Sequence, residues 1–183
     1  MRRAAALLLT AVWLTAGAAR LGAQEVSEFD LKAVFLYRFA GFVDWPVQDE
    51  GGRDGAFTVG VVGTDPFGTA LDALTERSVA GRPIEVLRFP DVEDLVPTDI
   101  LYVSPSEDRR LDQVIRAVGG RNTLTVGDSP DFLDAGGMIR FVTRDRRIHL
   151  EINRCAAEVE GFRIDARLLQ VADRVVDQCG SAR

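Results

Sequence analysis

Short, nearly all-apolar segments alternate with segments of helical spacing through the middle of this chain, and this alternation constrains the fold more than any other feature. The segment 57–63 is rich in valine and is typical of a strand buried on both faces. Asp65 and Pro66 follow it and predict a helix start, with Asp65 as N-cap and Pro66 as the first helical residue. The turn 81–83 then leads into a second strand, 84–89. These segments predict a β-α-β unit.

The same alternation continues along the chain. Residues 99–103 form a third predicted strand, and Ser106 is the expected cap of a helix that ends at the glycines 119–120. Residues 122–126 form a fourth predicted strand. Alternating strands and helices of these lengths indicate a largely parallel sheet covered on both faces.

The two apolar segments that follow, 138–143 and 147–152, are separated by three residues and predict an antiparallel hairpin. Asn153 is expected to cap a short helix, and Asp165 a final amphipathic helix that continues to Gly180. The expected fold is therefore one three-layer α/β domain. Its mixed, mostly parallel sheet has about five to six strands, with helices on both faces and a C-terminal antiparallel hairpin.

Residues 28–46 carry more apolar surface than an isolated helix can leave in water. Ser27 and Asp30 predict the helix start, and the helix is expected to continue to Trp45, before Pro46. Most of its aromatic side chains are expected to cover the sheet. At the predicted helix exit, Phe42, Val43 and Trp45 are candidates for contact with a partner or a second copy in a homodimer; the alternative is that they belong to the core.

The N-terminal residues 1–23 have the pattern of a secretory signal peptide: Arg2 and Arg3, an uncharged apolar run, and then small residues. Cleavage would leave an exported domain of residues 24–183 that is not inserted in the membrane; an uncleaved N-terminal anchor is the alternative. The formal net charge of −6 makes a nucleic-acid polymer an unsuitable partner, since such binding needs concentrated lysine and arginine.

Catalytic groups are scarce in this sequence. It has one histidine, His149, and lacks a nucleophile elbow or paired histidines at metal-ligand spacing, so we expect neither an enzyme nor a bound cofactor or metal. Arg147 and His149 share one face of a predicted strand, and Arg140 on the neighbouring strand extends this candidate site for a small anion or nucleotide. The alternative is that they are surface residues, or partners of Glu151.

The two cysteines, Cys155 and Cys179, lie in the C-terminal part of the chain. Export to an oxidising compartment favours a disulfide between them. A redox switch is the alternative.

Seven motifs, in order and correctly spaced, resemble the YfiR/HmsC-like periplasmic proteins between about residues 29 and 176. They are LKAVFLYRFAGFVDWP, VGVVGTDPFG, GRPIEV, ILYVSPSE, LTVGD, GGMIRFV, and IHLEIN followed by LLQVADRVV. The family commonly carries cysteines in the first strand and before the ILYVS strand, and this chain has none there. The pair Cys155 and Cys179 is therefore not carried over from the family.

The resemblance implies a periplasmic repressor that binds the sensor portion of an inner-membrane diguanylate cyclase, or a related sensor kinase, and holds it inactive. Cyclic-di-GMP signalling and biofilm formation would then follow the state of this complex. A periplasmic protein that binds a small anion or nucleotide is the alternative function.

Overall fold

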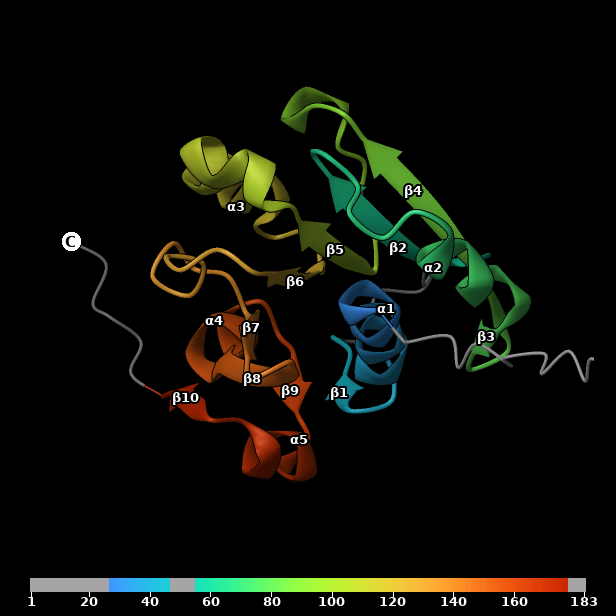
Figure 1. Ribbon diagram of the computed structural model, residues 1–183. Helices are drawn as coiled ribbons and strands as arrows, with labels where there is room; N and C mark the ends of the chain where they lie inside the picture. Colours follow the sequence, from blue (N-terminus) through green and yellow to red (C-terminus); the bar gives the residue numbers. More distant parts are fainter. Residues whose placement is uncertain (1–26, 47–54, 178–183) are drawn as a thin grey trace, which may run out of the picture.

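One sheet dominates the computed structural model, which describes residues 27–46 and 55–177 (Figure 1). Within these residues the sheet has eight strands. From edge to edge they are β10 (Arg174–Val176), β8 (Arg147–Asn153), β7 (Ile139–Arg144), β6 (Leu124–Gly127), β5 (Ile100–Val103), β2 (Phe57–Val62), β4 (Arg82–Phe89) and β3 (Ser78–Val79). The neighbours from β4 to β7 are parallel, β7 and β8 form the predicted antiparallel hairpin, and β10 is parallel to β8. The α/β class and the mixed, mostly parallel sheet are confirmed.

The five parallel strands have the order β4-β2-β5-β6-β7, which places the first of them, β2, between the second and the third. This is the flavodoxin-like order, with its topological switch point between β2 and β5. Every residue of β5 and β6 is buried, as expected for strands covered on both faces.

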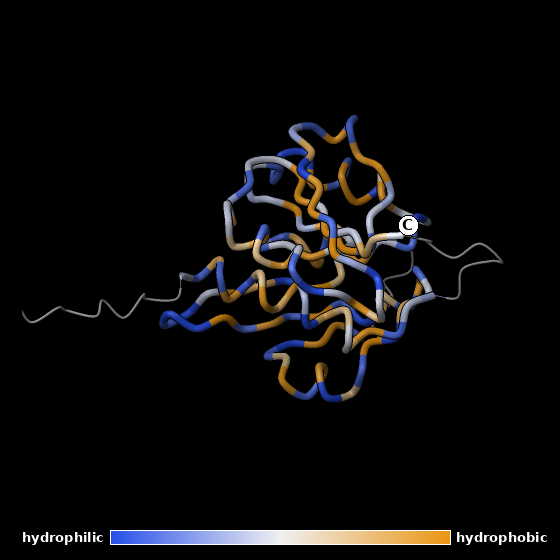
Figure 2. Tube along the Cα trace, turned by 90° about the vertical axis from the view of Figure 1, so that its right-hand side faces the viewer, coloured by the Kyte–Doolittle hydropathy of each residue, from blue (hydrophilic) through white to orange (hydrophobic). Residues whose placement is uncertain are grey.

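Alternate residues of β5 point into two separate cores. Ile100 and Tyr102 pack in the larger core, together with the inner face of α1 (Glu28–Phe39), α2 (Thr69–Asp72) and the 3-10 turn η1 (Ala73–Glu76). Leu101 and Val103 pack against α3 (Leu111–Val118) and the 3-10 turn η2 (Val92–Asp94) on the opposite face. Figure 1 shows α1 and α3 on opposite sides of the sheet, and Figure 2 shows hydrophobic segments inside and hydrophilic turns around them.

Helix α1 begins as predicted and ends earlier than predicted. The Ser27 hydroxyl accepts from the Asp30 amide, and the Asp30 carboxylate accepts from the Ser27 amide, a complete capping box. The expected continuation to Trp45 is wrong, because the helix ends at Phe39 and the chain turns at Gly41. The strand β1 (Val43–Asp44) then pairs with β9 (Arg163–Ile164) in a second, antiparallel sheet.

The predicted long C-terminal helix is also wrong. Asp165 caps a helix as expected, but α5 (Ala166–Val171) is short. Ala172 is extended, and the chain continues as β10 at the edge of the main sheet. The β-branched pair Val175 and Val176 suits this strand as well as it suited the predicted helical stripe. Asn153 caps α4 (Arg154–Val159) as predicted.

Two other helix starts are shifted from their predicted positions. Asp65 does not cap α2; its Oδ1 accepts from the Phe67 amide in a turn, and Arg88 Nε binds its Oδ2 at 2.7 Å. Ser104 rather than Ser106 caps the 3-10 segment η3 (Pro105–Arg110), which leads into α3. The side chain of Ser106 instead accepts from the Thr64 amide, and so joins the ends of β2 and β5.

Candidate partner-binding face

Helix α1 has an apolar face on each side. Its inner face contains Ala33, Leu36 and Phe39, each at most 1% exposed. On its outer face, Leu31 is 40% and Val34 45% exposed. A helix that is hydrophobic on all sides is normally covered on all sides. The outer face of α1 is therefore a candidate binding surface.

A groove of about 530 Å³ lies between this outer face and α5. Its apolar wall is extended by Val171, which is 66% exposed. The groove is lined by Leu31, Val34, Phe35, Arg38, Phe39, Phe42, Arg167, Leu168 and Val171. We call this surface the α1–α5 groove.

Two arginines border the apolar lining of the α1–α5 groove. The Arg167 guanidinium lies 5.2 Å from the centre of the Phe42 ring, a cation–π contact. It also binds Asp165 Oδ2 at 2.8 Å, and this arginine lowers the Asp165 pKa to about 2. Arg38 is exposed and has no ion pair within the described part of the chain. The rim of the groove therefore carries the positive charge of Arg38, while Asp165 offsets that of Arg167.

The three residues predicted for partner contact occupy different places. Phe42 lines the α1–α5 groove and is partly exposed. Val43 is 5% exposed and pairs with Ile164 in the small sheet. Trp45 packs edge-on against Phe57 and Phe162, with ring centres 5.3 and 5.4 Å apart, and its Nε1 donates to the Ala40 carbonyl. Of the three, Phe42 is best placed for contact, and its role stays a prediction.

A buried charge cluster lies beneath α1, and no sequence motif had indicated it. Lys32 is 3% exposed, and its Nζ lies 2.5 Å from Glu28 Oε1 and 2.9 Å from Asp128 Oδ2. Tyr102 donates its hydroxyl to the same Asp128 oxygen at 2.5 Å. Burial, and then the Asp128 charge, raise the Tyr102 pKa well above its ordinary value, while the bond from Lys32 lowers the Glu28 pKa. The cluster attaches α1 to the carboxyl ends of β5 and β6.

The predicted anion-binding residues do share one sheet face. The β7–β8 register places Arg140 opposite Glu151, and Arg147 and His149 lie on the same face of β8. Arg140 Nη1 lies 3.1 Å from Glu151 Oε2, and His149 Nδ1 lies 2.9 Å from Asp173 Oδ2. Carboxylates therefore already contact two of the three predicted anion-binding residues. Anion binding at this face stays a prediction.

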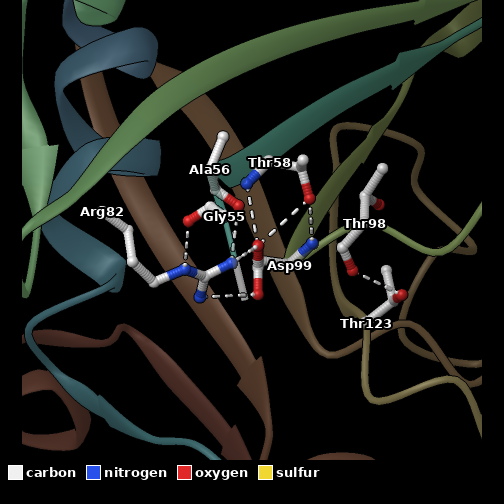
Figure 3. A network of polar contacts seen from close by, with 7 residues as sticks. All are labelled: Gly55, Ala56, Thr58, Arg82, Thr98, Asp99 and Thr123. Atoms are coloured by element: carbon white, nitrogen blue, oxygen red, sulfur yellow. Dashed lines mark hydrogen bonds and ion pairs between the residues drawn. The ribbon is translucent and has the colours of Figure 1, made fainter. Parts of the chain in front are cut away.

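A second polar network lies at the other end of the strands, where it joins their amino ends (Figure 3). Asp99 accepts from the amide and the hydroxyl of Thr58, and its own amide donates to the Thr58 hydroxyl. Arg82 Nη2 lies 3.0 Å from Asp99 Oδ2 and donates to the Ala56 carbonyl. In open α/β sheets ligands bind at the carboxyl ends of the strands. We therefore assign this network to stability.

The structure also bears on metal sites, membrane-spanning helices and the predicted disulfide. Residues 27–46 and 55–177 contain no group of three or more histidine, cysteine, aspartate or glutamate residues that could hold a metal ion. In the same ranges, no helix has the length and apolarity that crossing a bilayer requires. Cys155 is buried at the start of α4, and Cys179 lies outside the described residues, so their disulfide stays a prediction.

The flavodoxin-like sheet and its helices define a single α/β domain, with an apolar groove between α1 and α5. The family comparison gives a match over residues 29–173 to the model described as YfiR/HmsC-like. The chain belongs to the YfiR/HmsC-like family.

The comparison with solved structures finds similarity at low sequence identity. A conserved domain protein from Vibrio cholerae O1 biovar eltor is 16% identical, with a TM-score of 0.54; the match covers 81% of this chain and 60% of that one. This chain thus spans about three fifths of that protein. The ABC domain in complex with L-Trp from Streptococcus pneumonia is 12% identical, with a TM-score of 0.49 over 65% of this chain and 55% of that one. No curated protein matches the chain.

Proposed function

We propose that this protein is a periplasmic repressor that binds the periplasmic sensor portion of an inner-membrane diguanylate cyclase and holds it inactive. Cyclic-di-GMP production and biofilm formation would fall while the complex persists. The observation that carries the proposal is the family match over residues 29–173. A related sensor kinase is the alternative partner of this kind.

The proposed mechanism is a shift between two states of the cyclase. The repressor binds the inactive state more tightly than the active state, so binding moves the population toward inactivity. A tenfold difference in affinity corresponds to about 1.4 kcal/mol, within the range of measured allosteric couplings. Release follows when a signal weakens the complex.

The test uses detergent-solubilised inner membrane, in which both sides of the cyclase are accessible. Cyclic-di-GMP formation from GTP is measured with increasing amounts of the mature protein, residues 24–183. We expect a saturable fall in the rate, and a pull-down with the same protein that recovers a cyclase or sensor. An unchanged rate together with no recovered sensor would contradict the proposal.

Binding of a small anion or nucleotide has less support. Arg140 and His149 each face a carboxylate, so an incoming anion would meet Glu151 and Asp173 as well as the cations. Calorimetric titration with phosphate and nucleotides, on the wild type and on His149→Ala, separates the two functions. Saturable heat that His149→Ala removes would favour the anion site over the repressor.

A further inference from the structure

The exposed apolar side chains of α1 have the spacing of a helix–helix contact. Leu31, Val34, Phe35 and Arg38 lie at positions i, i+3, i+4 and i+7 and line the α1–α5 groove. Side chains at these positions form one continuous stripe on a helix. This stripe is distinct from the inner face that covers the sheet, because Leu36 and Phe39 on that face are buried.

Two further hollows extend the α1–α5 groove along the whole of α1. One, of about 690 Å³, shares Leu31 with it and lies beside the β7–β8 turn, where Arg146 lines it. The other, of about 430 Å³, shares Arg38, Phe42 and Arg167 with it and reaches β3. The 12 residues of α1 are about 18 Å long, which matches about three turns of a second helix.

The charge along most of this path is opposite to that of the whole protein. The chain has a formal net charge of −6, yet the charged residues that line the α1–α5 groove and the hollow near β3 are Arg38 and Arg167. The hollow beside the β7–β8 turn is lined by Arg146 together with Glu28 and Asp145. Arg77 adds a fourth guanidinium, 5.2 Å from the centre of the Tyr37 ring in the hollow near β3. An occupant with carboxylates beside an apolar stripe complements this surface.

We propose that the α1–α5 groove binds an amphipathic helix that presents apolar side chains at i, i+3 or i+4, and i+7, flanked by aspartate or glutamate. The inference rests on the proposed function in one respect, since the helix would belong to the membrane sensor. The walls of the groove are helices rather than a sheet edge, so an added strand would find no ladder of backbone groups to pair with.

The charges also disfavour the other occupants. A symmetric dimer through this face would place Arg38 and Arg167 of both copies in the same interface, which would then contain four arginines. The N-terminal residues 1–26 contain Arg2, Arg3 and Arg20 but one acidic residue, Glu25, so they do not complement a cationic rim. Neither of these charge arguments counts against an acidic helix from another protein.

The test is site-specific cross-linking in exporting cells. A photoreactive benzoylphenylalanine replaces Val34 in the groove or, as the matched control, Val159, a valine that is 74% exposed on α4. The cross-linked peptides are identified by mass spectrometry. We expect position 34 alone to capture an acidic amphipathic segment of a membrane sensor. Capture of a second copy or of residues 1–26, the same product from position 159, or no product would overturn the inference.

Substitutions in the protein that carries the photoreactive residue at position 34 test the apolar stripe and the charged rim separately. The yield of the cross-link is the quantity measured. Leu31→Glu is expected to lower its yield about tenfold or more, since it places a charge in the apolar stripe. Arg38→Glu should lower the yield about two- to fivefold at low salt, and Arg38→Lys should preserve it. Val159→Glu should change nothing. A loss of yield in Val159→Glu equal to that in Leu31→Glu would overturn the assignment of the groove.

The cyclase assay keeps this inference separate from the proposed function. If position 34 captures no acidic helix and the wild type still represses the cyclase, the groove assignment fails and the repressor function stands. If the wild type does not repress while position 34 still captures an acidic helix, the repressor function fails and the groove assignment stands.

Discussion

Lys32 Nζ lies 2.9 Å from Asp128 Oδ2 beneath α1, where the lysine side chain is 3% exposed. Lys32 is the only lysine in the chain. The aromatic rings of Phe29 and Phe141 also lie within 4.9 and 5.7 Å of its ammonium group. A charge this deeply buried is tolerated because carboxylates and aromatic faces surround it.

Replacement of Lys32 by methionine should lower the free energy of unfolding by about 3 kcal/mol, because it leaves Asp128 buried without its cation. The double variant Lys32→Met/Asp128→Asn should lose less than the sum of the single losses. Urea unfolding of the four proteins measures both values. Arg144→Met, which removes an exposed pair with Asp173, should cost at most about 1 kcal/mol. Additive losses at Lys32 and Asp128 would contradict the coupling.

The raised pKa of Tyr102 leads us to expect a loss of stability at alkaline pH. The pKa of this phenol in the folded protein is raised by burial and by the Asp128 charge. Above pH 10 the phenol is therefore deprotonated in the unfolded chain while it stays protonated in the folded protein, and this lowers the free energy of unfolding. The contribution is complete below pH 10 and falls as the pH rises, by about 1.4 kcal/mol per pH unit. Urea unfolding at pH 9 and pH 11 should show this fall in the wild type.

The matched control for the alkaline effect is Tyr102→Phe. It should be less stable at pH 8 by about 1.5 to 3 kcal/mol, since it loses a hydrogen bond to a charged partner. It should also lack the part of the alkaline fall that comes from this phenol. Equal falls in both proteins between pH 9 and pH 11 would assign the effect to other groups.

The sequence predicts the central strands well because their signal is local. β2 and β5 are short apolar runs between turn residues, and both appear within a residue or two of their expected bounds. The small strands were missed because β1, β3 and β9 have two residues each, too few for any periodicity.

Tertiary contacts decided what the sequence left open. Val175 and Val176 fit a helical stripe and a strand equally, and pairing with β8 selects the strand. Phe42 was predicted as a contact residue, but the other wall of its groove, α5, became apparent only from the fold. Lys32 and Asp128 are 96 positions apart, so nothing in the sequence pattern connects them.

The ring of Phe132 should require glycine at two positions, Gly127 at the end of β6 and Gly137 in the segment between β6 and β7. The ring is fully buried, and a Cβ placed on Gly127 would lie 2.6 Å from it; one on Gly137 would meet the ring as well. Gly127→Ala should therefore cost about 1–3 kcal/mol or more. Gly119→Ala, where the nearest atom is 3.6 Å from the new Cβ, should change stability by at most about 1 kcal/mol. Urea unfolding compares them, and equal losses would exclude the ring contact as the cause.

The predicted disulfide between Cys155 and Cys179 should be present in protein purified from the periplasm. Closure of a loop of about 25 residues should stabilise the fold by about 3 kcal/mol in the chain-entropy model. Maleimide labelling in denaturant should therefore modify no thiol before reduction and two after it. Modification of both cysteines without reductant would contradict the bridge.

The double variant Cys155→Ala/Cys179→Ala separates a structural bridge from a redox switch. A structural bridge predicts a less stable variant that represses the cyclase as the wild type does, because α4 lies outside the α1–α5 groove. A redox switch predicts that reduction of the wild type changes repression and that the variant no longer responds. Cyclase assays with and without reductant, at a temperature where both proteins are folded, decide between them.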